Sequence, residues 1–237
     1  MKARITIKAM GYQTILIQWD QPSDHSIVAT IQFLDKEYPD EILEMVPAFR
    51  ELAVYLQLDS DKEEVMEKLN RQLPLEELDA VLESNPIYRI PVSYAQKNAP
   101  DIERMAKEKE SSIQDLINLH TAATYQIQFL GFLPGFPYLK GLNPKLHQPR
   151  LPKPRAEVPA GAVGIAGSQS GIYPRSSPGG WNIIGRTPIS LFDIQQNPPA
   201  KFQAADRLQF FAVDDQEYHR IEKAVKKRQY QLEKSYD

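Results

Sequence analysis

Glycine and proline are concentrated in one part of this chain. Ten of the eleven glycines and nine of the nineteen prolines lie between Gly131 and Gly185. Glycine adopts positive φ and lets a second backbone or a ligand come close, whereas proline fixes φ and removes a hydrogen-bond donor. The same stretch carries six Lys and Arg residues and a single acid, Glu157, although the whole chain has a net charge of −3. A basic, closely shaped surface is therefore predicted here, within an otherwise acidic protein.

Length and composition indicate an ordinary globular protein. The 237 residues suffice for one large or two small domains, each with its own core. No apolar run approaches the ~20 residues that span a bilayer, and residues 1–10 alternate as a strand does, so we expect a cytoplasmic protein with no membrane partner. Zero cysteines exclude disulfides and thiolate metal sites, and the acidic net charge argues against nucleic acid as a partner.

The first domain is predicted over residues 1–85. Alternating apolar residues predict strands at 5–9, 15–19, 42–46 and 51–58. Apolar residues at helical spacing predict helical segments at 27–34, 65–69 and 75–82. The order ββαββα suits a small α/β sandwich, with helices on one face of a sheet.

The second domain is predicted over residues 86–237, because Pro86 and Pro91 disfavour helix in the residues before them. It opens with two helices, one near 102–106 and one after a capping-box pattern at Ser111–Gln114. Short strands with many turn residues follow from 124 to 193, then a strand at 208–213 and a terminal helix at 217–236. Short, closely spaced strands predict a barrel or a sandwich.

Self-contained catalytic and nucleotide motifs are missing. The spacing of Gly161, Gly164 and Gly167 fits neither a phosphate loop nor a dinucleotide fingerprint and is typical of a tight strand–turn–strand. Gln169 stands where a nucleophile elbow needs serine. The histidines lack the spacing of a metal motif, so no metal site is expected: His25, His120, His147 and His219.

Two loops remain as candidate binding surfaces. Residues 131–139 place Phe132, Phe136 and Tyr138 where no regular element can form, so these rings are either tucked over the end of a barrel or offered to a partner. Residues 149–155 bring three cations onto a stiff segment that suits a carboxylate or phosphate, although a solvated connector is the alternative.

Four motifs match those of one family: Gly131–Leu139, Val158–Gly167, Gly171–Pro174 and Ser177–Thr187. With them the chain resembles the family of the 5-oxoprolinase B subunit, also called allophanate hydrolase subunit 1 or the sensor-kinase inhibitor (Kip-type) family. The resemblance implies an α+β fold, with the small α/β-sandwich domain followed by a cyclophilin-like β-barrel domain. It also implies a hydrolase subunit, inactive alone, that works with subunits A and C. That complex opens 5-oxoproline to L-glutamate, driven by hydrolysis of ATP with Mg²⁺ as its counter-ion.

Within this hypothesis the candidate residues fall into three groups. The candidate catalytic residues are His120, Tyr173 and Arg186. The candidate substrate- or phosphate-binding residues are Arg150, Lys153, Arg155, Gly161, Gly164 and Gly167. The candidate partner-binding residues are Phe132, Pro134, Phe136 and Tyr138. For His120 the alternative is a structural one, as a cap on the last carbonyls of its helix.

Two other functions stay open. The chain could inhibit a sporulation-type sensor histidine kinase by blocking its autophosphorylation, with the loop aromatics as the contact. It could also be a partner subunit in allophanate or urea breakdown. One departure from the family concerns the turn before Asp206, where Ala205 replaces the usual glycine and puts a positive φ in doubt.

Overall fold

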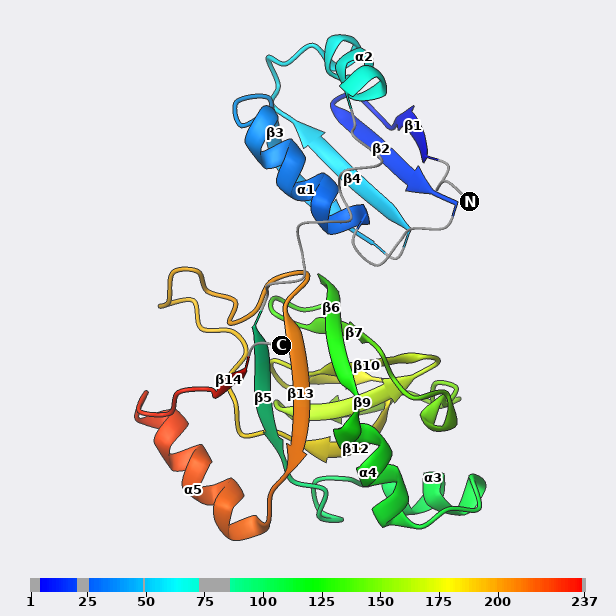
Figure 1. Ribbon diagram of the computed structural model, residues 1–237, viewed down its shortest axis with the longest axis vertical. Coiled ribbons are helices and arrows are strands. Elements are labelled where there is room, and N and C mark those ends of the chain that lie inside the picture. Colours follow the sequence, from blue (N-terminus) through cyan, green and yellow to red (C-terminus); the bar gives the residue numbers. More distant parts are fainter. Residues whose placement is uncertain (1–4, 21–25, 49, 73–85, 236–237) are drawn as a thin grey trace. The chain divides into compact units, whose positions relative to one another are not determined.

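The computed structural model describes residues 5–20, 26–48, 50–72 and 86–235, and the chain divides into two compact units, Met1–Ser84 and Asn85–Asp237 (Figure 1). The first unit contains the following elements: β1 (Ile5–Ala9), β2 (Thr14–Trp19), α1 (Ser26–Glu37), β3 (Ile42–Pro47), β4 (Glu51–Leu56) and α2 (Lys62–Gln72). These match the predicted strands and the first two helical segments. The segment predicted at 75–82 lies outside the described residues.

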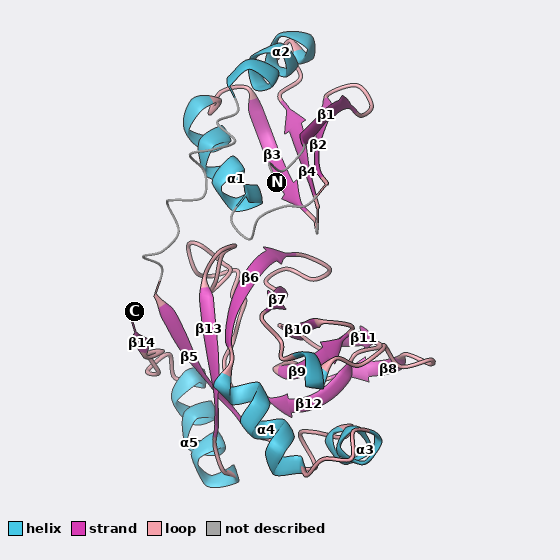
Figure 2. Cartoon of the chain, turned by 45° about the vertical axis from the view of Figure 1, so that its right-hand side comes forward, coloured by secondary structure: helices cyan, strands magenta, loops and turns pink. Residues whose placement is uncertain are grey.

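The sheet of the first unit has the order β1-β2-β4-β3, and every pair is antiparallel. Apolar residues alternate along the two central strands, so one face is buried: Ile15, Ile17 and Trp19 from β2, with Leu52, Val54 and Leu56 from β4. Both helices cover this face with Leu34, Val65 and Leu69 (Figure 2). The period of two in the strands is therefore what fixes the side on which the helices pack.

The second unit contains these elements: β5 (Ile87–Val92), α3 (Ile102–Glu108), α4 (Ile113–Ala122), β6 (Thr124–Leu130), β7 (Pro137–Lys140), η1 (Pro144–Leu146), β8 (Arg155–Val158), β9 (Ala162–Ala166), β10 (Gln169–Ile172), β11 (Ser177–Gly179), β12 (Asn182–Arg186), β13 (Arg207–Ala212), α5 (Asp215–Lys226) and β14 (Lys234–Ser235). The main sheet has the order β12-β9-β10-β7-β6-β13-β5-β14, and β8 pairs with β11 as a separate ribbon. The pair β13–β5 is parallel.

The closed barrel expected from the sequence is not formed by continuous strand pairing among the described residues. The strand ladder runs from β12 to β14 without returning to its start. The residue after β5, Ser93, makes one isolated bridge to Arg186 of β12, with two backbone hydrogen bonds of 2.9 Å. The register of β12 on β9 also shifts between Ile183 and Gly185. The unit is therefore a mixed α/β domain built on an eight-stranded sheet, in which the end strand β12 meets the residue after β5 at this single bridge.

Two helix ends differ from the prediction: the start of α4 and the end of α5. The N-cap of α4 is Ser112 rather than Ser111, in a capping box with Asp115. Helix α5 ends at Lys226, ten residues before its predicted end, because Arg228 adopts φ +57° and Gln229 N–H bonds back to the carbonyl of Ala224.

Close packing explains much of the glycine cluster. A Cβ on Gly171 would lie 2.8 Å from the ring of Phe136, and one on Gly179 would lie 2.3 Å from the hydroxyl of Tyr173. Both rings belong to a second, small core that lies beside the main one: Phe136, Val158, Ala162, Ala166, Tyr173, Trp181 and Ile183. The turn before Asp206 keeps its positive φ, at +70°, although Ala205 occupies it.

Candidate functional site

A cationic arm, His147–Arg155, follows η1 and is anchored to neighbouring strands by its backbone. Gln148 and Gly167 exchange two backbone hydrogen bonds of 2.7 and 3.1 Å. The amide of Leu151 donates to the carbonyl of Gly180 at 2.8 Å. Between and beyond these anchors, the side chains of Arg150 and Lys153 are exposed. Since proline also restricts three positions of the arm, its two exposed cations, Arg150 and Lys153, stand on a fixed backbone.

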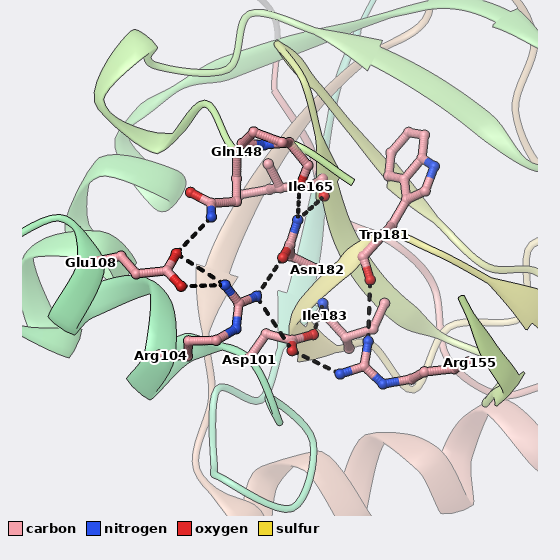
Figure 3. Close-up of polar contacts among 10 residues, drawn as sticks. Asp101, Arg104, Glu108, Gln148, Arg155, Ile165, Trp181, Asn182 and Ile183 are labelled. Atoms are coloured by element: carbon pink, nitrogen blue, oxygen red, sulfur yellow. Dashed lines mark hydrogen bonds and ion pairs between the residues drawn. The ribbon is translucent and has the colours of Figure 1, made fainter. Parts of the chain in front are cut away.

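Arg155 is an anchor of the arm. Its Nη2 lies 2.7 Å from Oδ1 of Asp101, and its Nη1 donates to the carbonyl of Trp181 at 3.3 Å (Figure 3). The Asp101 side chain is only 5% exposed, and its Oδ2 accepts from the amide of Ile183 at 2.6 Å. Because a buried carboxylate needs a partner charge, Arg155 neutralises Asp101 and has less capacity for a ligand than the sequence suggested.

Beside this pair, Asn182 and Arg104 connect α3 to the arm. Nη2 of Arg104 donates to Oδ1 of Asn182 at 2.5 Å, and its Nη1 donates to both carboxylate oxygens of Glu108 at 2.8 and 2.9 Å (Figure 3). Nε2 of Gln148 donates to the same carboxylate at 2.7 Å. The hydrogen bond from Arg104 lowers the pKa of Glu108, and the one from Gln148 adds to the effect.

The aromatic loop divides into a buried part and an exposed part. Phe136 is 1% exposed and belongs to the small core, so it supports the loop rather than facing a partner. Phe132 is 60% exposed, has φ +67°, and lies edge-on to the rings of Phe136 and Tyr173. Pro134 is exposed and Tyr138 is half-buried. The surface offered to a partner is therefore centred on Phe132.

The charge of Arg150 affects two tyrosines of the second unit. Burial raises the pKa of Tyr138, and the positive charge of Arg150 opposes that rise. Burial likewise raises the pKa of Tyr173, with an opposing effect from a backbone hydrogen bond to Trp181 and from Arg150. The charge of Arg150 therefore acts on Tyr138 and Tyr173, and the ring of Tyr173 also lies edge-on to that of Phe132.

His120 lies in the main core, away from this surface. Its ring is fully buried, stacks on Phe210 with centroids 4.5 Å apart, and has its Nδ1 2.7 Å from the hydroxyl of Tyr94. Burial lowers the pKa of His120 to about 3, so the ring is neutral near pH 7. Neither a cap on helix carbonyls nor an exposed acid or base describes this side chain, which is a hydrogen-bonded part of the core.

The remaining candidates are held by backbone contacts. The amide of Gly161 donates to the carbonyl of Tyr173 at 2.7 Å, that of Gly167 donates to Gln148, and Gly164 pairs within the sheet. Nε of Arg186 donates to the carbonyl of Ala160 at 2.8 Å. In this conformation the amides of Gly161 and Gly167 are occupied, so neither is available to cradle a phosphate.

The sequence prediction missed Asp101, Arg104 and Asn182. Only Asn182 carried a usable signal, because an amide side chain inside the apolar run 181–184 needs buried hydrogen-bond partners. The described part of the chain contains no group of three or more His, Asp or Glu residues that could hold a metal ion. No helix among the described residues is long and apolar enough to cross a membrane.

Comparisons with known proteins give one consistent relationship. The family described as "Carboxyltransferase domain, subdomain C and D" matches residues 5–202. The B subunit of 5-oxoprolinase from Bacillus subtilis (strain 168) is 33% identical over 234 residues, covering 92% of this chain and 97% of the relative. The crystal structure of TTHA0988 is 30% identical, with a TM-score of 0.74, over 85% of this chain. This chain spans 40% of the length of TTHA0988.

A more distant solved structure shares the fold. The Kluyveromyces lactis urea amidolyase is 18% identical, with a TM-score of 0.77, and 16% of its length is covered. The motifs that suggested the family in the sequence lie within the region that the family model matches. The chain therefore belongs to the carboxyltransferase subdomain C and D family, within its group of 5-oxoprolinase B subunits.

Proposed function

We propose that this protein is the B subunit of an ATP-dependent 5-oxoprolinase that hydrolyses 5-oxoproline to L-glutamate together with subunits A and C. The observation that carries the proposal is the similarity to the B subunit from Bacillus subtilis over nearly the full length of both chains. The surface around the cationic arm supports it, because the exposed cations Arg150 and Lys153 stand on it while His120 is buried in the core. Such a half-site suits a subunit that is inactive alone.

The proposed reaction requires cations of the kind that the cationic arm exposes. The ring amide of 5-oxoproline is stabilised by resonance, and transfer of a phosphoryl group from ATP to its oxygen makes the carbonyl carbon open to attack by water. That route places negative charge on phosphate and carboxylate oxygens, which cations stabilise. Arg150 and Lys153 are the exposed cations of the arm. In this proposal they contact the oxyanions, and Mg²⁺ arrives with ATP as its counter-ion.

In this proposal the other candidates have indirect roles. Tyr173 is 1% exposed and lies under Phe132, so it shapes the surface from below. Arg186 is half-buried and joins β12, an end strand of the main sheet, to the residue after β5 through its bridge to Ser93. That bridge also supports a cyclophilin-like barrel as the architecture of the second unit. No prolyl isomerase activity follows from such a fold, because fold alone carries no chemistry.

The test is reconstitution with purified subunits A and C and measurement of ATP-dependent glutamate release. Arg150→Ala should lower kcat/KM by at least ~10-fold if its guanidinium binds an oxyanion in the transition state. Arg175→Ala is the matched control, because Arg175 is also an exposed arginine of the glycine-rich region. Equal kinetics in the two variants would remove Arg150 from the site. Turnover that persists when this chain is omitted would contradict the proposed function itself.

A second candidate function is inhibition of a sensor histidine kinase. The exposure of Phe132 at a positive φ favours it, because a bulky residue is rarely held in that conformation without a functional reason. Phe132→Ala should relieve inhibition of kinase autophosphorylation, whereas Phe136→Ala is a poor probe, since it opens a cavity in the small core. Full inhibition by a folded Phe132→Ala protein would eliminate this contact. Partnership in urea breakdown is supported by a relative named "Putative urea carboxylase" from Emericella nidulans, 28% identical over 136 residues, and by the fold shared with the urea amidolyase.

A further inference from the structure

The cationic arm holds its cations in two different ways. Arg155 forms an ion pair with the buried Asp101. Arg150 extends from a backbone that is anchored on both sides, by Gln148 and Leu151, and Lys153 follows the second anchor; both of their side chains are exposed. An arm that is fixed before a ligand arrives loses less conformational freedom on binding. The anchors are therefore as relevant to recognition as the exposed cations.

The side chain of Asn182 is a third anchor of the arm. Asn182 is 1% exposed. Its Nδ2 donates to the carbonyl of Pro149 at 2.8 Å and to that of Ile165 at 3.1 Å (Figure 3). Its Oδ1 accepts from Nη2 of Arg104 at 2.5 Å. Both amide hydrogens and the carbonyl oxygen are thus used. Because Pro149 directly precedes Arg150, this amide fixes the backbone at the point from which the Arg150 side chain leaves.

The guanidinium of Arg150 suits an oxyanion that presents two neighbouring oxygens. Its charge acts on the phenols of Tyr138 and Tyr173, and the exposed ring of Phe132 lies edge-on to Tyr173. A guanidinium binds a carboxylate or a phosphate through two parallel hydrogen bonds, and this geometry is lost when its backbone shifts.

We propose that Asn182 is a positioning residue for an oxyanion-binding site in which Arg150 contacts the ligand. The inference rests on the proposed function, since 5-oxoproline offers a carboxylate and ATP offers phosphates, which share this chemistry. Asn182 touches no ligand; it acts through the carbonyl of Pro149. A change at Asn182 therefore alters binding only as far as Arg150 takes part in it.

The first experiment compares Asn182→Asp with Asn118→Asp in the reconstituted complex. Asn182→Asp keeps the size of the side chain and an acceptor for Arg104 but removes both donors, so Pro149 loses its anchor. The KM of one substrate should rise by at least ~10-fold while kcat changes by less than ~2-fold. Separate KM values for 5-oxoproline and ATP show which one supplies the oxyanion. Asn118 lies on the exposed side of α4, so its variant controls for the added charge.

A double-mutant cycle separates positioning from general stabilisation. If Asn182 acts through Arg150, the KM of the double variant Arg150→Ala/Asn182→Asp equals that of Arg150→Ala within ~2-fold. Effects that multiply, or an Asn182→Asp variant with both KM values unchanged, overturn the proposal. If Asn182→Asp does not fold, Arg104→Met takes its place, because it removes the donor to Asn182 from a side chain that is 40% exposed. An unchanged KM in that variant would equally overturn it.

A binding measurement covers the case in which the wild-type complex gives no turnover. The proposed function then fails, and the same cycle is measured as the Kd of the full chain for tripolyphosphate by NMR titration. Weaker binding in each single variant, with no further loss in the double variant, supports the positioning role. Failure of the wild-type chain to bind tripolyphosphate, or losses that multiply, overturns it.

Discussion

Acid should destabilise the second unit through one buried ring, that of His120. The folded-state pKa of this side chain is lowered from 6.5 to about 3 by burial. The unfolded chain therefore binds more protons than the folded chain between these two values, and stability falls as the pH drops below 6.5. At pH 5, which is 1.5 units below the unfolded value, the loss is ~2 kcal/mol, because one unit corresponds to about 1.4 kcal/mol.

The measurement is the free energy of unfolding in urea at pH 7.5 and pH 5, for the wild type and for His120→Gln. A Trp19→Phe background leaves Trp181 as the single tryptophan, so that fluorescence follows the second unit. Glutamine does not titrate and can still bond to the hydroxyl of Tyr94. We expect the wild type to lose ~2 kcal/mol more than His120→Gln over this range. Equal losses in the two proteins would show that His120 does not stay buried and neutral, and would refute this account of the ring.

Three further predictions concern backbone conformation and packing. Glu110 is exposed at φ +50° in the turn that ends α3, so Glu110→Gly should stabilise the second unit by ~1 kcal/mol in urea unfolding, whereas Glu110→Ala should not. Gly171→Ala should cost ~1–3 kcal/mol, because the new Cβ would lie 2.8 Å from Phe136, and a neutral effect would contradict the packing described. Phe132→Gly should raise the melting temperature, since it relieves the strain of φ +67°. The same variant should lower the affinity, in a pull-down, for the protein that binds the surface around Phe132. A lower melting temperature together with a lower affinity would mean that Phe132 is structural.

The elements of the first unit could be predicted because their signals are local. Ile15 and Ile17 in β2, and Leu52 and Val54 in β4, alternate with more exposed residues, and this period of two defines both strands and their buried face. The end of α5 at Lys226 could not be predicted, since Arg228 just beyond it adopts a positive φ that glycine usually marks.

The candidate site was only partly predictable because its supporting contacts join distant parts of the sequence. The arm was visible from its composition, but the pairing of Arg155 with Asp101 joins residues 54 positions apart. Charge alone therefore overstated Arg155 as a ligand-binding residue. His120 was misjudged for a similar reason, since nothing near it in sequence shows that Phe210 stacks on its ring.

The most direct test of the central claim is the coupled release of glutamate and ADP from 5-oxoproline and ATP by this chain with subunits A and C. The complete set is expected to release the two products in step, and each omission, that of this chain included, is expected to abolish glutamate release. Undiminished turnover without this chain, or no turnover with the complete and folded set, would contradict its assignment as the B subunit of a 5-oxoprolinase.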